Sequence, residues 1–397
     1  MPYLDHAATT PIHPDALAAL TAHLATDATG NPSSLHASGR RARRVVEESR
    51  ESLAASLGAR PSEIVLTGGG TESDNLALKG LYWSLRAQAG PDGPAPRLLV
   101  NPTEHHAVLD TAVWLAEHEG ARLDWLPVDR LGRVSPEELD AALAAAPDVP
   151  TLVSVMWANN EVGTVNPVRE LVAAAHRHGA LVHSDAVQAL GQLPVSFAES
   201  GLDAMTVTAH KIGGPVGTGA LLLTRELAPV PLLHGGGQER DVRSGTLDTA
   251  GAAAFAAAAA AAVRELPEHA ARLTALRDEL IAAVAKEVPE AVLTGDPGPG
   301  PEGRLPGNAH FAFPGCEGDS LLLLLDAQGI ECSTGSACTA GIAQPSHVLL
   351  AMGYEPEEAR GTLRFSLGRT STSEDVAAVA AAIGPAVERA RTAGLSR

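Results

Sequence analysis

From about residue 60 onward, short apolar segments alternate with longer segments of helical periodicity. Apolar segments separated by helices are typical of a parallel sheet that is covered by helices on both faces. The strands that we expect are at 63–67, 97–101, 151–156, 180–184 and 204–208, and the helices at 71–87, 106–119, 136–145 and 167–178. A further strand at 219–224 follows its predecessor without room for a crossover helix, so we expect it to run antiparallel. The predicted fold class is α/β.

The length of the chain indicates two domains, because 397 residues exceed what one hydrophobic core usually organises. An Ala-rich helix near 250–263 leads out of the sheet domain, and an amphipathic helix at 266–288 follows it. After a Gly/Pro-rich loop at 295–307, the remaining expected elements are strands at 308–313, 331–333 and 363–366 and a helix at 319–327. We expect residues 15–255 to form the large domain, and residues 1–14 and 256–397 to form a smaller α+β domain.

The net charge of −18 argues against nucleic acid or an anionic membrane as the main partner. The first residues have neither a basic stretch nor an apolar core, so we expect no secretory signal, and the Ala-rich run is too weakly apolar to span a bilayer. The three cysteines, Cys316, Cys332 and Cys338, lack CxxC spacing. Sparse cysteines without a signal indicate reduced thiols and a cytoplasmic location, and we expect no metal site.

Polar residues follow the predicted parallel strands, at the edge of the sheet where ligands of open α/β folds bind. They are Gly70 and Thr71 after 63–67, His105 after 97–101, Asn160 after 151–156, Asp185 and Gln188 after 180–184, and Thr208, His210 and Lys211 at the end of 204–208. A lysine amine and a carboxylate are what pyridoxal phosphate (PLP) requires, since the amine forms a Schiff base with its aldehyde and the carboxylate pairs with its ring nitrogen. The glycine turn before a helix suits the phosphate. His105 would stack on the ring and transfer protons, and Asn160 and Gln188 would bond the ring oxygen.

Each of these residues alone also has an ordinary structural explanation. Asp185 could cap a helix, and His210 with Lys211 could be a surface pair. Their joint occurrence at successive strand ends favours the cofactor site. Lysine usage adds support, because only Lys79, Lys211 and Lys286 are lysines among 29 Lys and Arg residues. A chain that uses Arg wherever a charge suffices keeps a lysine where an amine is needed.

Cys338 lies in a stretch of small residues, 333–341, which leaves its thiol uncrowded. A sulfur carrier that reaches a buried cofactor and an outside acceptor requires such a position. The alternative, a buried small residue, is the interpretation that we favour for Cys316 and Cys332. Arg364 is flanked by apolar residues in a predicted strand, and its fork could bind a substrate carboxylate or form a salt bridge, with neither favoured by this pattern alone.

The chain resembles the cysteine desulfurases of the NifS/IscS type, in class V of the PLP-dependent aminotransferase superfamily, over nearly its whole length. The matching stretches are YLDHAATTP (3–11), GNPSSLH (30–36), TGGGTESDNLALKG (67–80), TEHHAVLD (103–110), NNEVGTV (159–165), HSDAVQALG (183–191), TAHKIGGPVGTG (208–219), GGGQERDVRSGTLDT (235–249), STGSACTAG (333–341) and RFSLGR (364–369). Where the family usually has Ser, Thr208 keeps the hydroxyl.

The resemblance implies the PLP-dependent transferase fold type I, with a mostly parallel seven-stranded sheet. The residue roles that it implies are Lys211 as Schiff-base lysine, Asp185 at the pyridine nitrogen, His105 on the ring, Asn160 and Gln188 at its oxygen, Gly70, Thr71, Thr208 and His210 at the phosphate with Thr246 of a second subunit, and Arg364 with Asn160 at the substrate. Lys211, His105 and Cys338 would be catalytic. Cys338 would take the sulfur of L-cysteine as a persulfide, alanine would leave, and the homodimer would pass sulfur to an iron–sulfur scaffold or a tRNA-thiolating enzyme.

Other functions of the same fold remain open at this point. An aminotransferase needs no thiol, so Cys338 argues against it, whereas a selenocysteine lyase is not distinguished by the sequence. A catalytically silent sulfur-assembly scaffold would have no need for Lys211 and Asp185 together.

Overall fold

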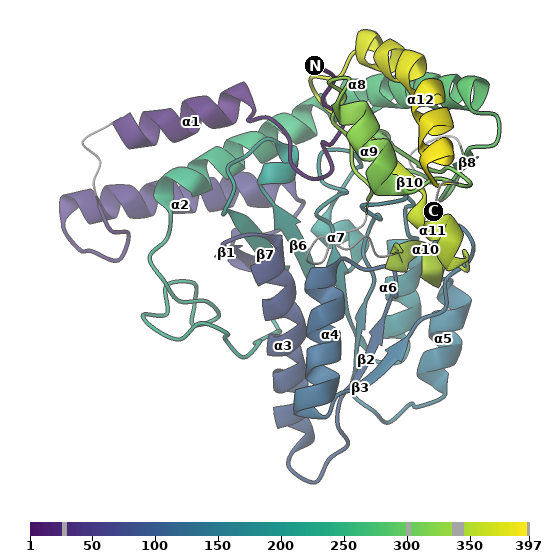
Figure 1. Cartoon of the computed structure of the whole chain (residues 1–397). Coiled ribbons are helices and arrows are strands. Elements are labelled where there is room, and N and C mark those ends of the chain that lie inside the picture. The colour runs from purple at the N-terminus through teal and green to yellow at the C-terminus, as the bar shows by residue number, and fades with distance from the viewer. Residues whose placement is uncertain (26–29, 299–302, 336–344, 395–397) are drawn as a thin grey trace.

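The computed structural model describes residues 1–25, 30–298, 303–335 and 345–394 of the chain. A seven-stranded sheet forms its centre (Figure 1). The spatial order is β1 (Ile64–Thr67), β7 (Gly219–Leu223), β6 (Ala204–Thr208), β5 (Leu181–Asp185), β4 (Thr151–Ser154), β2 (Arg97–Val100) and β3 (Arg122–Trp125). All neighbours are parallel except β7, which runs antiparallel to β1 and β6. The predicted fold class and the antiparallel strand are confirmed.

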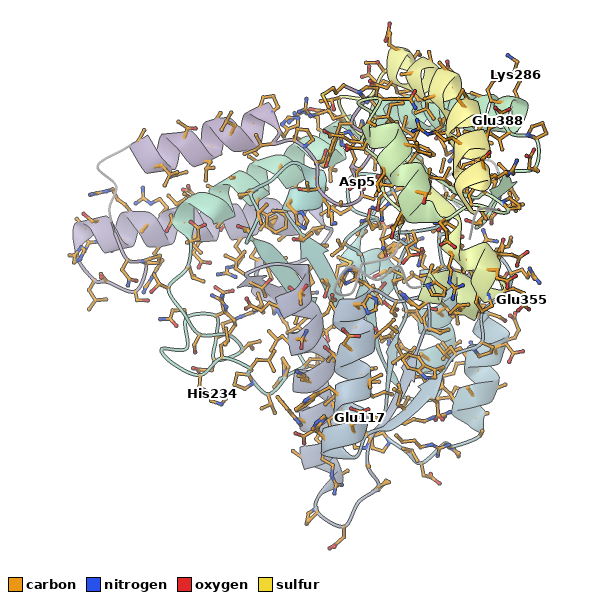
Figure 2. The ribbon with its side chains drawn as sticks, viewed as in Figure 1. Asp5, Glu117, His234, Lys286, Glu355 and Glu388 are labelled. Carbon is orange, nitrogen blue, oxygen red and sulfur yellow. The ribbon has the colours of Figure 1, made fainter. Side chains whose placement is uncertain are left out.

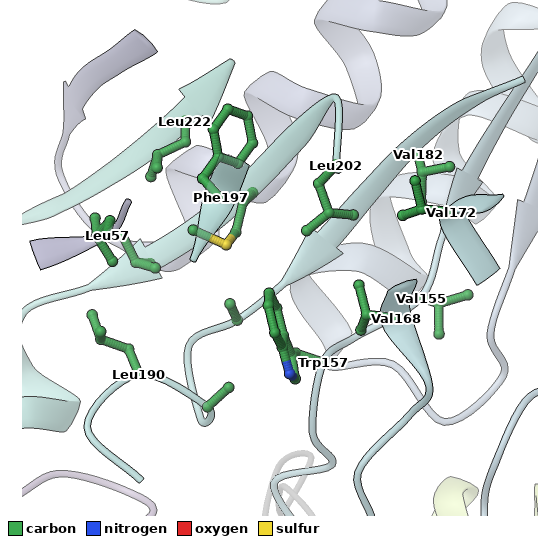
Figure 3. Packing of buried hydrophobic residues seen from close by; sticks show 14 of the residues in the cluster. Leu57, Val155, Trp157, Val168, Val172, Val182, Leu190, Phe197, Leu202 and Leu222 are labelled. Carbon is green, nitrogen blue, oxygen red and sulfur yellow. The ribbon is translucent and has the colours of Figure 1, made fainter. Parts of the chain in front are cut away.

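The two faces of the sheet pack against different helices, because successive strand residues point to opposite sides. Leu222 belongs to the core shared with α2 (Ala37–Ser56), α5 (Pro136–Ala144), α6 (Val168–His176), α7 (Phe197–Ser200) and the first part of α8 (Thr249–Glu287). Figure 3 shows part of this core, where Trp157, Phe197 and Leu202 lie against the strands. Leu221, the neighbour of Leu222 in β7, packs on the other face of the sheet, under α3 (Gly70–Ala89) and α4 (His106–Glu119). Helices on both faces leave the ends of the strands free for a site.

A second core surrounds a three-stranded antiparallel sheet of β10 (Thr362–Ser366), β9 (Asn308–Ala312) and β8 (Val292–Leu293). The second part of α8 packs on it with α9 (Gly318–Asp326) and α12 (Ser373–Gly394) (Figure 1). Leu4 is buried in the same core, since the first residues bridge to Glu331 and Ser366. The remaining elements are α1 (Pro14–Ala25), α10 (His347–Ala351), α11 (Pro356–Arg360) and the 3₁₀ turns η1 (Pro61–Glu63) and η2 (His210–Ile212). The exact domain boundaries stay a prediction.

The expected strands of the large sheet are present, with ends that differ by one or two residues. Two expectations were wrong, and the strand β3 was not expected at all. The strand expected at 331–333 is only a pair of isolated bridges. The helices expected at 250–263 and 266–288 are one helix, α8, which continues through Pro267. A proline inside a helix costs about 3 kcal/mol. The two ends of α8 pack on different cores, which offsets this cost.

Within the described ranges, no helix combines the length and the apolar character needed to cross a membrane.

Candidate active site

A cavity of about 430 Å³ opens at the carboxyl ends of the parallel strands, which is within the usual size of a cofactor site. Most of the predicted site residues line it together: Gly70, Thr71, His105, Asn160, Asp185, Gln188, Thr208, His210, Lys211 and Arg364. They come from five strand ends of the large sheet and from β10 of the small one. The joint placement that the sequence pattern predicted is therefore present.

The glycine turn between β1 and α3 forms one end of the cavity. Gly69 precedes α3 with a φ of 142°, a conformation that side chains rarely permit. A Cβ on Gly219 would lie 2.7 Å from Gly69 Cα, so β7 also needs a glycine to approach the turn. The first amides of a helix have no intrahelical acceptor, and the helix dipole is positive there. Gly70 and Thr71 thus provide N–H donors suited to a phosphate.

Lys211 lies on η2, immediately after β6. Its Nζ donates to Ala7 O at 2.6 Å and to Ala8 O at 2.7 Å, so the N-terminal segment holds the amine at the cavity. Burial, with a smaller contribution from the Arg364 charge, lowers the pKa of Lys211 to about 8. An amine with this pKa is largely uncharged in mildly alkaline solution and can attack an aldehyde.

Asp185 is the last residue of β5 and is 5% exposed. Its Oδ1 accepts a hydrogen bond from the Val187 N–H at 2.8 Å. Burial raises the pKa of Asp185 to about 6, against the opposing effects of that hydrogen bond and of Lys211. The carboxyl group is therefore mostly ionised at neutral pH and suits a protonated ring nitrogen.

His105 caps α4, and its Nδ1 accepts a hydrogen bond from the Ala107 N–H at 3.1 Å. The neutral imidazole consequently carries its proton on Nε2. Burial and the nearby Lys211 lower the pKa of His105, which favours the neutral form. Gln188 donates from Nε2 to Ala7 O at 2.9 Å, which directs its amide oxygen away from that carbonyl.

Arg364 is 5% exposed and forms a salt bridge, one of the two possibilities left open by its sequence context. Its Nη2 donates to Asp5 Oδ1 at 2.7 Å, and its Nη1 donates to Asn160 O at 2.9 Å. Asp5 is labelled in Figure 2. Arg364 lines the cavity, and its guanidinium has five N–H donors, of which these two hydrogen bonds use one each on Nη1 and Nη2, so donors remain for an anion.

One predicted residue, Thr246, lies away from the main cavity of its own chain. It lines a separate small cavity with Gly68 and Arg243. Cys338 falls outside the described residues, although Gly335 and His347, on either side of that segment, line the main cavity. Cys316 and Cys332 are buried, as expected, and burial raises the pKa of Cys332 to about 12.

Sequence reasoning missed several residues at the cavity. Ala7 and Ala8 contribute through their backbone carbonyls, and Asp5 binds Arg364 from the far end of the chain. Asp74 lines the cavity, and Glu104 is buried beside Asp185. A signal existed for the last two, because each stands in the same segment as a predicted residue, Thr71 or His105.

Comparisons with known proteins identify the family of the chain. Residues 2–379 match the family model of class V aminotransferases. The IscS-like cysteine desulfurase of Mycobacterium tuberculosis is 58% identical over 396 residues, which cover 100% of this chain and 98% of that protein. A solved NifS-like protein has a TM-score of 0.85 and 33% identity, covering 100% of this chain and 99% of its own. A structure of SspA in complex with cysteine has a TM-score of 0.77 and 30% identity, and the match covers 94% of this chain and 100% of the SspA chain.

Class V aminotransferases take PLP, and the cavity contains an amine, a carboxylate and a glycine turn, which are the groups suited to an aldehyde, a ring nitrogen and a phosphate. The chain belongs to the class V aminotransferase family and, within it, to the IscS-like cysteine desulfurases.

Proposed function

We propose that this protein removes sulfur from L-cysteine with PLP, releases L-alanine and holds the sulfur as a persulfide on Cys338. The observation that carries the proposal is Lys211, an amine with a pKa lowered to about 8 in the same cavity as the buried carboxylate of Asp185. The relatives add the substrate, since the similar protein of M. tuberculosis is a cysteine desulfurase and the similar SspA structure contains cysteine.

The residues that line the cavity would hold the cofactor. Lys211 would bind its aldehyde carbon, Asp185 its ring nitrogen, and Asn160 and Gln188 its ring oxygen, and His105 would contact the ring. Gly70, Thr71, Thr208 and His210 would bind the phosphate. When bound, PLP supplies an electron sink for charge that develops on the substrate carbon atoms.

The substrate carboxylate would bind Arg364, with Asn160 beside it. Arg364 lines the cavity and has N–H donors beyond those used by its protein partners, and Asp5 would keep the guanidinium oriented through Nη2. When it is not bonded to the cofactor, the Lys211 Nζ would be a base of suitable pKa to move a proton at the substrate carbon. His105 Nε2 would donate or accept a second proton.

Sulfur transfer then involves the Cys338 thiolate. Its sulfur attacks the sulfur of the substrate, so that a sulfur–sulfur bond forms and the carbon–sulfur bond breaks. The electron pair of the broken bond stays with the carbon, which takes up a proton and leaves as alanine. Cysteine and one thiol therefore give alanine and one persulfide, without any further oxidant or reductant.

The deciding experiment measures alanine and sulfide from L-cysteine in the presence of a reducing thiol. We expect equal amounts of both products, and a Cys338→Ala variant that binds cofactor and cysteine but releases no sulfide. Full sulfide release by that variant would contradict the role of Cys338. Selenocysteine is assayed in parallel, and a strong preference for it would make the protein a selenocysteine lyase instead.

The partners of the reaction belong to the proposal as well. We expect a homodimer in which Thr246 of one subunit reaches the phosphate site of the other, a cytoplasmic location, and an iron–sulfur scaffold or a tRNA-thiolating enzyme as sulfur acceptor. The position of Thr246 outside its own main cavity supports the first of these.

A further inference from the structure

Two carboxyl groups without an assigned role are buried beside Asp185. Asp74, in α3, is 1% exposed, and Glu104, just before α4, is fully buried. Both lie close enough to Asp185 for its charge to raise their pKa values, and Asp74 also lines the main cavity. Glu104 accepts a hydrogen bond from the N–H of Met156, another residue of the cavity wall, so three buried carboxyl groups from three segments of the chain lie at this cavity.

Each of the two has an oxygen that no protein group satisfies. Within the described residues, Asp74 Oδ1 and Glu104 Oε2 have no hydrogen-bond partner. The other Glu104 oxygen, Oε1, accepts a hydrogen bond from the Met156 N–H. The Thr206 hydroxyl lowers the pKa of Asp74, but its effect is smaller than the rise caused by burial. An ionised carboxylate with an oxygen in this state carries a large desolvation penalty.

No protein cation neutralises them in the described part of the chain. The one basic group near Asp74 is His183, whose Nε2 is 3.6 Å from Asp74 Oδ1. His183 is fully buried, its Nε2 is hydrogen-bonded to Thr206 Oγ1 at 3.0 Å, and burial lowers its pKa to about 3, so it is neutral. Glu104 takes part in no ion pair between described residues, and Lys211 acts on Asp185 instead.

The three groups therefore cannot all be charged, since adjacent buried carboxylates disfavour one another's ionisation. Asp185 is the one that the structure equips to stay ionised, because it accepts the Val187 N–H and faces Lys211. Protons on Asp74 and Glu104 remove their mutual repulsion with Asp185. Were either of them ionised, Asp185 would itself be driven towards its neutral form.

We infer that Asp74 and Glu104 are positioning residues that are held as neutral carboxylic acids and so leave Asp185 as the single anion facing the cofactor's ring nitrogen. The inference rests on the proposed function only in assigning Asp185 to that nitrogen. One negative charge in the cluster balances the one positive charge of a protonated pyridine. If all three carboxyl groups were ionised, they would repel one another and compete with the ring nitrogen for protons.

Infrared spectroscopy of the PLP-loaded protein at neutral pH tests this directly, because a protonated carboxylic acid has a carbonyl band at higher frequency than a carboxylate. We expect Asp74→Asn and Glu104→Gln each to remove one such band. The matched control is Glu117→Gln, which changes an exposed carboxylate on α4 and should remove none (Figure 2). Bands that are absent from the wild type, or unchanged in both variants, would overturn the inference.

The absorbance of bound PLP, titrated against pH, gives a second readout. Since both variants replace one neutral group by another of the same shape, we expect the titration midpoint to stay close to that of the wild type. If the wild-type groups were ionised, removing their charge would shift the midpoint by about one pH unit or more, which would also overturn the inference. A protein that keeps both infrared bands but releases no sulfur would contradict the proposed function and leave this inference standing.

Discussion

At the residue scale, Lys211 connects the chemistry of the site to pH. Its pKa of about 8 lies below the 10.5 of a free lysine, because burial disfavours the charged form. The amine reacts with an aldehyde only when it is uncharged. We therefore expect the protein stripped of cofactor to take up PLP at a rate that rises about tenfold per pH unit below pH 8 and levels off above it. Stopped-flow absorbance of the forming yellow complex measures this rate.

Variants of lysine separate this effect from general charge. Lys211→Ala and Lys211→Arg should stay colourless, because neither provides an amine at η2. Lys286→Arg is the control, since Lys286 is an exposed lysine at the end of α8 (Figure 2). If the rate of PLP uptake by the wild type kept rising up to pH 10, the cavity would not lower the pKa of Lys211.

Arg364 gives a second prediction at this scale. Replacing it by Lys keeps the charge but loses the planar fork that can bind a carboxylate while Asp5 occupies Nη2. We expect Arg364→Lys to raise KM for L-cysteine by roughly 10- to 100-fold, in line with the loss of one charge-assisted hydrogen bond or two. Steady-state kinetics measures KM, and the absorbance of bound PLP should be unchanged. A normal KM would mean that the Asp5 salt bridge is the only task of Arg364.

At the scale of elements, a buried ion pair fastens α2 to β1 and to the loop that carries Thr246. Glu239 is 1% exposed and accepts from Arg50 Nη1 at 2.8 Å, from Arg50 Nη2 at 2.7 Å and from the Leu66 N–H at 2.8 Å. Glu239→Ala would leave the Arg50 charge buried without its partner. We expect this variant to lose about 3–5 kcal/mol of unfolding free energy, measured by urea denaturation.

The double variant Arg50→Met/Glu239→Leu distinguishes the effect of an unpaired buried charge from the effect of altered packing. It removes both charges and the buried imbalance, so it should recover much of the stability that Glu239→Ala loses. If the double variant were as unstable as Glu239→Ala, the lost unfolding free energy would come from altered packing and not from the unpaired charge.

The same scale explains which elements the sequence could predict. Parallel strands covered on both faces are continuous apolar runs, and those were recognisable. By contrast, β3 reads Arg-Leu-Asp-Trp because it is an edge strand with exposed ends, so its pattern resembles a loop. In α8 the proline and the change from Ala-rich to amphipathic sequence suggested two helices, while the tertiary packing of both parts keeps one.

The site follows the same division. Residues that immediately follow strands were predictable, because the fold brings strand ends together. Asp5 was not, since its partner Arg364 is 359 positions away and only the pairing of the first residues with β10 joins them. Glu104 and Asp74 stand in segments that were predicted to reach the site, but their burial could not be predicted, because charged residues are expected at the surface.

At the scale of the whole molecule, the proposed homodimer with shared sites leads to a prediction about Thr246. Thr246 lies away from the main cavity of its own chain, so a Thr246→Ala chain should damage the site of its partner rather than its own. We expect Thr246→Ala alone to weaken PLP binding, and Lys211→Ala alone to be inactive. When the two variants are unfolded together and refolded, a mixed dimer contains one site with Lys211 from one chain and Thr246 from the other, and this site is intact.

Random reassembly should place about a quarter of all sites in this intact state, because half of the dimers are mixed and each has one good site. Sulfide release from L-cysteine, measured before and after mixing, detects the recovery. Mixing Lys211→Ala with itself is the control and should recover nothing. If Thr246 acts within its own chain, every chain in the mixture lacks one required residue, and activity stays at the sum of the two separate variants.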